Sequence, residues 1–131
     1  MTAEADRLCK LGVVLTDRGS KYAVSGAPVR DRAAVDAVLK DLKRDKAYAK
    51  ATHNTWGVQL SDGGRLKGDD GEAGAGMVIL RMLERAELAD HVIVVTRWYG
   101  GKHLGGDRFR HVQTCVSAYL QSNGHGGKET G

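Results

Sequence analysis

Residues 91–96 read HVIVVT, a segment whose apolar centre shows no alternation with polar residues. A strand with one face in solvent alternates polar and apolar residues, whereas an unbroken apolar run is typical of a central strand covered by other elements. The glycine-rich loop 97–106 follows, and residues 107–121 then place apolar side chains at helical spacing. We therefore expect a fold built around one buried strand that leads through a glycine turn into a helix.

The rest of the chain carries local signals for further strands and helices. Residues 11–16 and 21–26 are short β-favouring runs around a turn, which predicts a hairpin. Asp31 is placed to cap a helix that runs to about Lys46. The remaining predicted segments are a strand over 49–61, a polar glycine-rich loop over 62–76 and a helix over 74–87.

These signals give the order β-β-α-β-α-β-α, without a repeat or a linker. The order predicts an α+β fold, a two-layer α/β sandwich in which a mixed sheet carries its helices on one face. Residues 1–121 are expected to form a single domain, and the glycine-rich residues 122–131 a flexible tail.

The composition narrows the class of protein. A chain of 131 residues is long enough for one domain with a core, and no apolar run reaches the roughly 18 residues of a membrane span. The start MTAEADRLCK lacks the apolar stretch of a secretory signal. Cys9 and Cys115 form no C-x-x-C motif, so we expect free thiols in a reducing cytoplasm, with Cys115 packed in the core.

The net charge of +4 is unevenly distributed along the chain. Residues 1–68 hold 13 Lys/Arg against 8 Asp/Glu, and residues 91–131 hold 5 against 2. Between them, residues 69–90 hold 2 Lys/Arg against 6 Asp/Glu. An anionic partner such as RNA would have a landing site if the fold brought the two basic blocks to one face.

The loop in TRWYGGKHLGGDRFRHV, residues 96–112, lies between a buried strand and a helix start, where anions often bind. It does not match a P-loop or a G-x-G-x-x-G motif. Asp107 at the head of the helix favours a cap over a bound anion. Arg97 beside Trp98 suits phosphate contact and base stacking. A structural turn and an anion contact both remain open.

Two further features could carry chemistry. Asp69, Asp70 and Glu72 in DDGE could hold a cation, could be a solvated loop at a helix start, or could pair internally, Glu72 with Arg97. His53 is a lone strand histidine, more often structural than catalytic. No zinc-ligand spacing and no nucleophile signature is present, so we expect no metal, no cofactor and no catalytic residue.

Three segments in this order resemble one family. They are AKATHNTWGV, GDDGEAGAG and VIVVTRWYGGKHLGGDRFRHV, and the resemblance covers roughly residues 20–121. They are similar to the IMPACT family, whose bacterial relatives are called YigZ, and the RWYGG wording is closest to the eukaryotic branch. The positions that carry the match are Ala51, His53, Asp70, Gly71, Glu72, Arg97, Trp98, Tyr99, Gly100, Gly101, Leu104, Gly105 and Asp107.

The resemblance implies a two-layer fold like that of a small-subunit ribosomal protein domain and a domain of elongation factor G. It also implies a translation-associated regulator, which contacts the ribosome or RNA or binds the activator of the general-control kinase, and it implies no enzymatic activity. The family pattern differs at Gly106, where the eukaryotic branch has proline. The RWD domain of eukaryotic members and the C-terminal ferredoxin-like domain of bacterial ones fall outside the match.

We therefore expect a non-enzymatic binding domain whose basic face contacts RNA or the ribosome. The residues of that face are Arg97, Trp98, Lys102, His103, Arg108 and Arg110. The alternatives are a protein–protein module without nucleic-acid binding, and an enzyme that uses His53, Glu72 and Arg97 on a phosphorylated ligand.

Overall fold

Five strands form one sheet in the order β1-β2-β5-β3-β4, and every neighbouring pair is antiparallel. The computed structural model describes residues 8–123. The strands are β1 (Cys9–Asp17), β2 (Ser20–Pro28), β3 (His53–Gln59), β4 (Arg65–Gly68) and β5 (His91–Trp98). The helices are α2 (Arg32–Leu42), α3 (Lys46–Ala49), α4 (Ala75–Ala86) and α5 (Asp107–Ser122).

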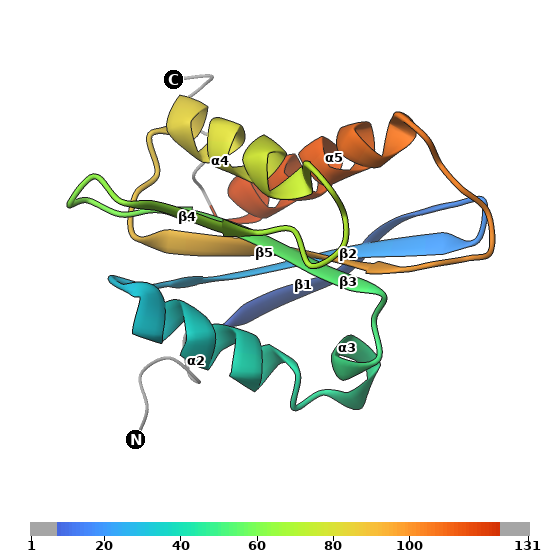
Figure 1. Ribbon diagram of the computed structural model, residues 1–131, viewed down its shortest axis with the longest axis horizontal. Coiled ribbons are helices and arrows are strands. Elements are labelled where there is room, and N and C mark those ends of the chain that lie inside the picture. Colours follow the sequence, from blue (N-terminus) through green and yellow to red (C-terminus); the bar gives the residue numbers. More distant parts are fainter. Residues whose placement is uncertain (1–7, 124–131) are drawn as a thin grey trace.

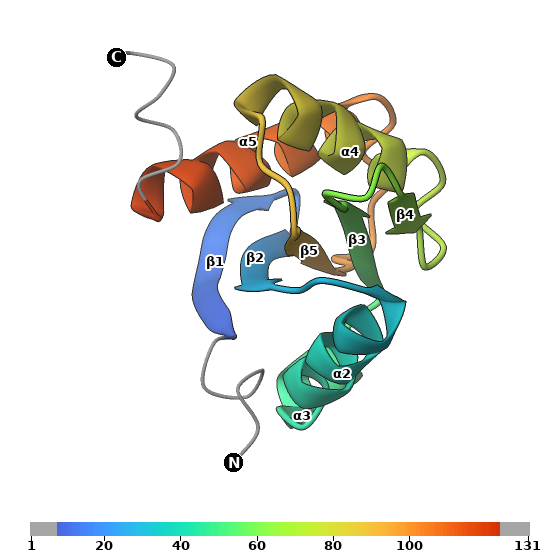
Figure 2. The same cartoon turned by 90° about the vertical axis from the view of Figure 1, so that its left-hand side faces the viewer.

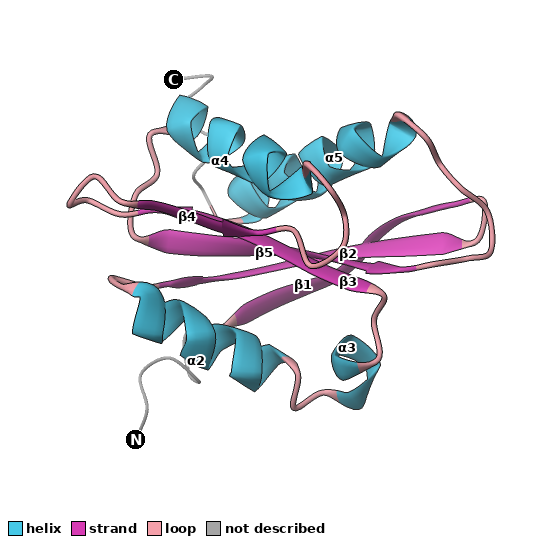
Figure 3. Cartoon of the chain, viewed as in Figure 1, coloured by secondary structure: helices cyan, strands magenta, loops and turns pink. Residues whose placement is uncertain are grey.

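The predicted α+β class is confirmed, but the arrangement of its layers differs from the prediction. Helices α4 and α5 cover one face of the sheet, and α2 and α3 lie on the other (Figures 1 and 3). The expectation of helices on one face is therefore wrong. The expected mixed sheet is also wrong, because β5 enters between β2 and β3 and runs opposite to both.

The strand β5 explains why two helical layers are needed. Its side chains alternate between two buried clusters, so Ile93 and Val95 pack toward α4 and α5, while Val92 and Val94 pack toward α2. The view along the sheet in Figure 2 shows β5 at the centre of the strand order. The apolar run of residues 91–96 is thus part of a central strand, as predicted, and both faces of that strand are covered.

Several predictions made from short sequence segments are confirmed. The hairpin pairs β1 with β2, and the Asp31 carboxylate accepts a hydrogen bond from the N–H of Ala34 at 2.9 Å, as a cap should. Cys115 is fully buried, and burial raises the pKa of its thiol to about 12, so it packs as an apolar side chain. Residues 124–131 of the expected tail lie outside the described residues, and Ser122 still belongs to α5.

Two elements differ from the sequence prediction. The helix from Asp31 ends at Leu42, and Asp45 caps a separate short helix by accepting from the N–H of Ala47 at 3.0 Å. The loop predicted over 62–76 contains β4, which pairs with the end of β3. Its four residues are too few and too polar to stand out as a strand in the sequence.

Candidate functional site

The site predicted from the sequence lies where β5 ends and the glycine loop begins. The register of the sheet aligns His53 of β3, Arg97 of β5 and Tyr22 of β2 in one row across the three strands. Tyr22 packs in the cluster beneath α4 and α5, so the row belongs to that face of the sheet. The next residue, Trp98, alternates to the opposite face and packs beside α3.

Arg97, near the end of β5, and Glu72, in the loop before α4, form a buried ion pair. Their exposed fractions are 4% and 3%, and Nη1 of Arg97 donates to both carboxylate oxygens of Glu72, at 3.2 and 3.1 Å. Nη1 of Arg108 reaches the same carboxylate at 3.2 Å. Of the three alternatives for the acidic segment, internal pairing of Glu72 with Arg97 is the one the structure shows.

Aromatic rings complete the surroundings of Arg97. The guanidinium carbon lies 5.5 Å from the ring centre of Tyr22 and 5.6 Å from that of Tyr99. These are distances at which a cation is attracted to a ring. The Nε atom of Arg97 is buried and has no hydrogen-bond partner within residues 8–123. Arg97 therefore points inward, away from the exposed basic face on which the sequence prediction placed it.

The other acidic residues of DDGE have structural partners. The Asp69 carboxylate accepts from the N–H groups of Gly74 and Gly76 at the start of α4, at 3.0 and 2.8 Å. Burial opposes the charge of Asp69, but these two donors hold the pKa of its carboxyl below the usual range. Asp70 accepts from the N–H of Asn54 at 2.7 Å. Within the described residues, no group of His, Cys, Asp and Glu side chains could hold a metal ion.

His53 is fixed by the same loop. Its Nδ1 lies 2.8 Å from the backbone oxygen of Asp70, so Nδ1 carries a proton that it donates to that oxygen. The approach is close because residue 71 is a glycine with φ +88°, where an added Cβ would lie 3.0 Å from the imidazole ring. The loop and the strand histidine are therefore built as one unit.

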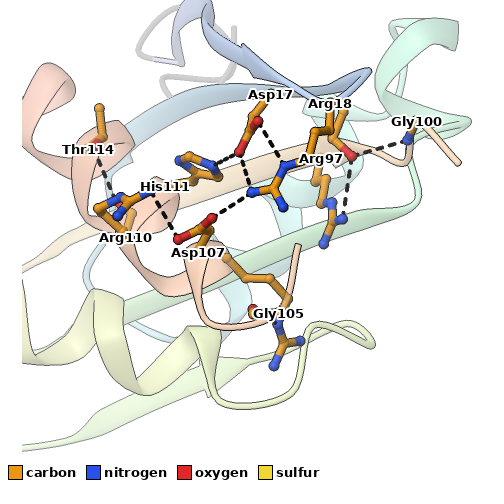
Figure 4. A network of polar contacts seen from close by, with 11 residues as sticks. Asp17, Arg18, Arg97, Gly100, Gly105, Asp107, Arg110, His111 and Thr114 are labelled. Carbon is orange, nitrogen blue, oxygen red and sulfur yellow. Dashed lines mark hydrogen bonds and ion pairs between the residues drawn. The ribbon is translucent and has the colours of Figure 1, made fainter. Parts of the chain in front are cut away.

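Asp107 does not cap α5, contrary to the prediction. The N-cap is Gly106, without a side-chain hydrogen bond, and Asp107 is the first helical residue. Figure 4 shows its carboxylate between Arg18 and Arg110. The oxygen-to-nitrogen distances are 2.5 Å to Arg18 and 3.0 Å to Arg110. Arg18 also bonds Asp17, which in turn bonds His111 at 2.7 Å, so this chain of contacts ties the hairpin turn to α5.

The glycines of the loop serve different purposes. Gly100 packs against the hairpin turn so closely that an added Cβ would lie 2.0 Å from the carbonyl carbon of Gly19. Gly101 and Gly105 adopt φ of +95° and +57°, a region that favours glycine. Leu104 between them is 2% exposed and anchors the loop in the core. These contacts support the structural-turn interpretation for the backbone of the loop.

The six residues predicted as one contact face fall into three groups. Lys102, His103 and Arg110 are exposed, and Arg108 is half-buried beside Glu72. Arg97 is inside, and the indole of Trp98 donates to the backbone oxygen of Ala47 at 2.8 Å on the opposite face of the sheet. The structure thus keeps four of these side chains on one loop and helix start, and separates the other two.

Two hollows open at this end of the sheet, one on each face. The first, on the face of α4 and α5, has a volume of about 360 Å³ and is called the cleft below. The charged, imidazole and aromatic side chains that line it are those of His53, Glu72, Arg97, Tyr99, His103 and Arg108. Its charged and imidazole groups include His53, Glu72 and Arg97, the three residues that the enzyme alternative needs.

The second hollow lies on the face of α3 and has a volume of about 480 Å³. It is called the groove below, and it is lined by Gly12, Val13, Gly19, Lys21, Ala47, Tyr48, Trp98 and Tyr99. Sequence reasoning missed Lys21 and Tyr48, because the hairpin and α3 meet Trp98 only in the folded sheet. A signal was present in the basic residues on either side of Tyr48, Lys46 and Lys50.

The family description "Impact N-terminal domain" matches residues 18–120, which include all the residues that line the cleft and all those of the groove except Gly12 and Val13. The chain belongs to the IMPACT family. This confirms the resemblance drawn from the sequence. The IMPACT domain carries its motif residues Glu72 and Arg97 as a buried pair, and its motif glycines Gly100 and Gly105 at positions of close approach or positive φ.

Relatives of this IMPACT domain are found in several animals. The "Protein IMPACT homolog" of Caenorhabditis elegans is 37% identical, over 91% of this chain and 49% of the relative. "Protein IMPACT" of Bos taurus is 38% identical, over 83% of this chain and 36% of the relative. The chain thus spans half or less of the length of these curated relatives.

Two solved structures share the fold. One, described as a hypothetical protein, has a TM-score of 0.62 at 22% identity, over 86% of this chain and 55% of that chain. The other is described as the two-domain translational regulator Yih1, with a TM-score of 0.56 at 26% identity, over 93% of this chain and 51% of that chain. Among the described residues, no helix is long and apolar enough to cross a membrane.

Proposed function

We propose that this IMPACT domain is a non-enzymatic, translation-associated binding domain that contacts RNA or the ribosome. The observation that carries the proposal is the groove, in which the exposed Tyr99 and the half-buried Trp98 stand beside Lys21, while Tyr48 is 8% exposed and forms part of the wall. Proteins that bind single-stranded RNA combine aromatic side chains, on which bases stack, with cations that follow the phosphates. The description of Yih1 as a translational regulator supports the translation context.

Exposed cations continue from the groove on two sides. Lys46 and Lys50 flank the part of α3 that lines it, and Lys102 follows Tyr99 by three residues. None of the three has an acidic partner within residues 8–123. Lys10 is less available, because it pairs with Asp45 at 3.1 Å while lying over the ring of Tyr48. We propose that the groove and these lysines act together as one basic, aromatic surface at this end of the sheet.

The dependence of RNA affinity on salt tests this proposal. For single-stranded RNA, the slope of log affinity against log salt should be about −0.7 for each phosphate contacted. Lys21→Ala with Lys102→Ala should weaken binding and make the slope shallower by about 1.4, if each lysine contacts one phosphate. The measurement is a binding titration at several salt concentrations in a buffer that keeps the protein folded.

The matched control removes two exposed charges elsewhere. Arg81 and Arg85 lie on α4, on the other side of the sheet from the groove. Arg81→Ala with Arg85→Ala changes the net charge equally and should leave the slope unchanged. Equal losses in the two double variants would mean that only the total charge matters, and the proposed surface would be rejected.

A second candidate function, binding of a protein partner such as the activator of the general-control kinase, is favoured by strand β1. Within residues 8–123 this edge strand pairs with β2 alone, and it exposes 38% of Leu11 and 56% of Val13. An open strand edge with exposed apolar side chains can pair with another chain. Binding of the purified activator that survives nuclease treatment and is lost on Leu11→Asp, a change outside the lining of the groove, would favour this function over RNA contact.

A further inference from the structure

The cleft on the face of α4 and α5 holds more positive than negative charge. Two guanidinium groups, those of Arg97 and Arg108, share the single carboxylate of Glu72. The imidazoles of His53 and His103 add no negative charge. A buried cation is costly unless it is paired, so an uncompensated guanidinium beside an open cavity favours an anion there.

Both arginines keep donors that the protein does not use. Nε of Arg97 has no partner among the described residues, but the atom itself is buried, so Arg97 contributes mainly its positive charge to the lining of the cleft. Arg108 donates from Nε to the backbone oxygen of Gly105 and from Nη1 to Glu72, and within residues 8–123 its Nη2 has no partner. Guanidinium groups with free N–H donors match the geometry of phosphate oxygens.

Asp107, whose negative charge would repel an anion at the start of α5, is paired with other residues outside the cleft. Asp107 does not line the cleft, because Arg18 and Arg110 hold its carboxylate on the side of the hairpin turn (Figure 4). The first N–H groups of α5 are also in use, since they bond the backbone oxygens of residues 104–106 at 3.1–3.3 Å. The side chains of the cleft, rather than the helix start, would therefore hold an anion.

The cleft is larger than a phosphate ion needs. Its volume of about 360 Å³ lies in the range of small-molecule sites, roughly 300–1,000 Å³. Tyr99 is 45% exposed and stands 5.9 Å from the imidazole of His103, so the two rings form an aromatic rim on which a flat group can stack.

We propose that the cleft binds a phosphate monoester of nucleotide size. The phosphate lies against Arg97 and Arg108, and the remainder of the ligand stacks on Tyr99 and His103. Two sources carry this chemistry, a free nucleoside monophosphate and the 5′-phosphate end of an RNA chain. The site lies on the opposite face of the sheet from the groove and shares only Tyr99 with it, and it does not depend on the RNA contact proposed above.

Titration of the protein with AMP and with adenosine tests the proposal. AMP should bind, and adenosine should bind at least about tenfold more weakly, since it lacks the group that forms the charged hydrogen bonds. Arg108→Ala should weaken AMP binding by about tenfold or more. Arg110→Ala removes the same charge two residues further along α5, outside the cleft, and should leave AMP affinity unchanged.

A further variant controls for the possibility that Arg108→Ala weakens binding only by unfolding the protein. Arg108→Lys keeps the charge beside Glu72 but loses the planar fork, so it should fold and still bind AMP more weakly than the unmodified protein does. Equal affinities for AMP and adenosine, or equal effects of Arg108→Ala and Arg110→Ala in folded protein, would overturn the proposal.

The two sources are separated with one short RNA, prepared with a 5′-phosphate and with a 5′-hydroxyl. A preference for the phosphorylated RNA that Arg108→Ala abolishes assigns the site to RNA ends. AMP binding without that preference assigns it to a free nucleotide. Loss of RNA binding on Lys21→Ala with unchanged AMP binding would separate the groove from the cleft.

Discussion

Arg97 is a charged residue that the fold keeps inside. Its guanidinium is held by Glu72 and by the rings of Tyr22 and Tyr99, and the ion pair joins the end of β5 to the loop before α4. Removing one partner of a buried ion pair leaves the other charge without compensation, which costs far more than removing an exposed pair. The main role of Arg97 is therefore to fix the shape of this end of the sheet.

This role predicts a large loss of stability for Glu72→Gln. The free energy of unfolding should fall by about 3 kcal/mol, because two guanidinium groups then lose their carboxylate. Asp36→Asn is the matched control, since Asp36 pairs with Arg32 on an exposed helix face and its loss should cost about 0.5 kcal/mol or less. Urea unfolding of both variants gives the comparison. Similar losses would show that the buried pair contributes little.

For individual residues, the sequence was a better guide to which side chains pair than to where those side chains lie in the fold. The pairing of Glu72 with Arg97 follows from residue types and was one of three open alternatives. The burial of Arg97 depends on the strand register that places it beside Tyr22, which one sequence does not specify. The role of Asp107 was predicted wrongly, because its partner Arg18 lies 89 residues away in the chain.

Among the elements, the hairpin turn and α5 depend on each other. Asp17 of the turn accepts from Arg18 and bonds His111 of α5, while Arg18 reaches Asp107 at the helix start. The hydrogen bonds from Arg18 and then from His111 hold the pKa of the Asp17 carboxyl well below its usual range. The turn and the helix are thus joined by a charge that must stay ionised.

This contact predicts a specific dependence of stability on acid. In the unfolded chain an Asp titrates near pH 3.9, so the contribution of Asp17 is complete above about pH 5 and is lost as the pH falls toward its lower folded pKa. Asp17→Asn should lower the Tm at pH 6, and its difference from the unmodified protein should shrink toward pH 2.5. Thermal unfolding across this range tests it, and a constant difference would contradict it.

The elements themselves were predictable where their signals are local. The cap at Asp31 and the buried run of β5 are readable from a few neighbouring residues. Strand β4 was missed because it exists through pairing with β3, and the break between α2 and α3 was missed because basic residues continue across it. Pairing and helix breaks of this kind depend on tertiary contacts that outweigh weak local preferences.

For the whole molecule, the decisive feature is that helices cover both faces of the sheet. The two faces produce two different hollows at the same end, a charged cleft and an aromatic groove, and Tyr99 lines both. The sequence identified the family and the segment, but the predicted strand ended at residue 96. Strand β5 continues to Trp98, so the alternation of side chains along the strand places Arg97 and Trp98 on opposite faces of the sheet.

We propose above that RNA lies in the groove on the face of α3. Amide chemical-shift mapping of the isotope-labelled protein with a short single-stranded RNA tests it directly. If RNA lies in the groove, the largest changes in amide chemical shift should fall on Lys21, Ala47, Tyr48, Tyr99 and Lys102. Largest shifts on α4 and β4, or no shifts at RNA concentrations well above that of the protein, would contradict it.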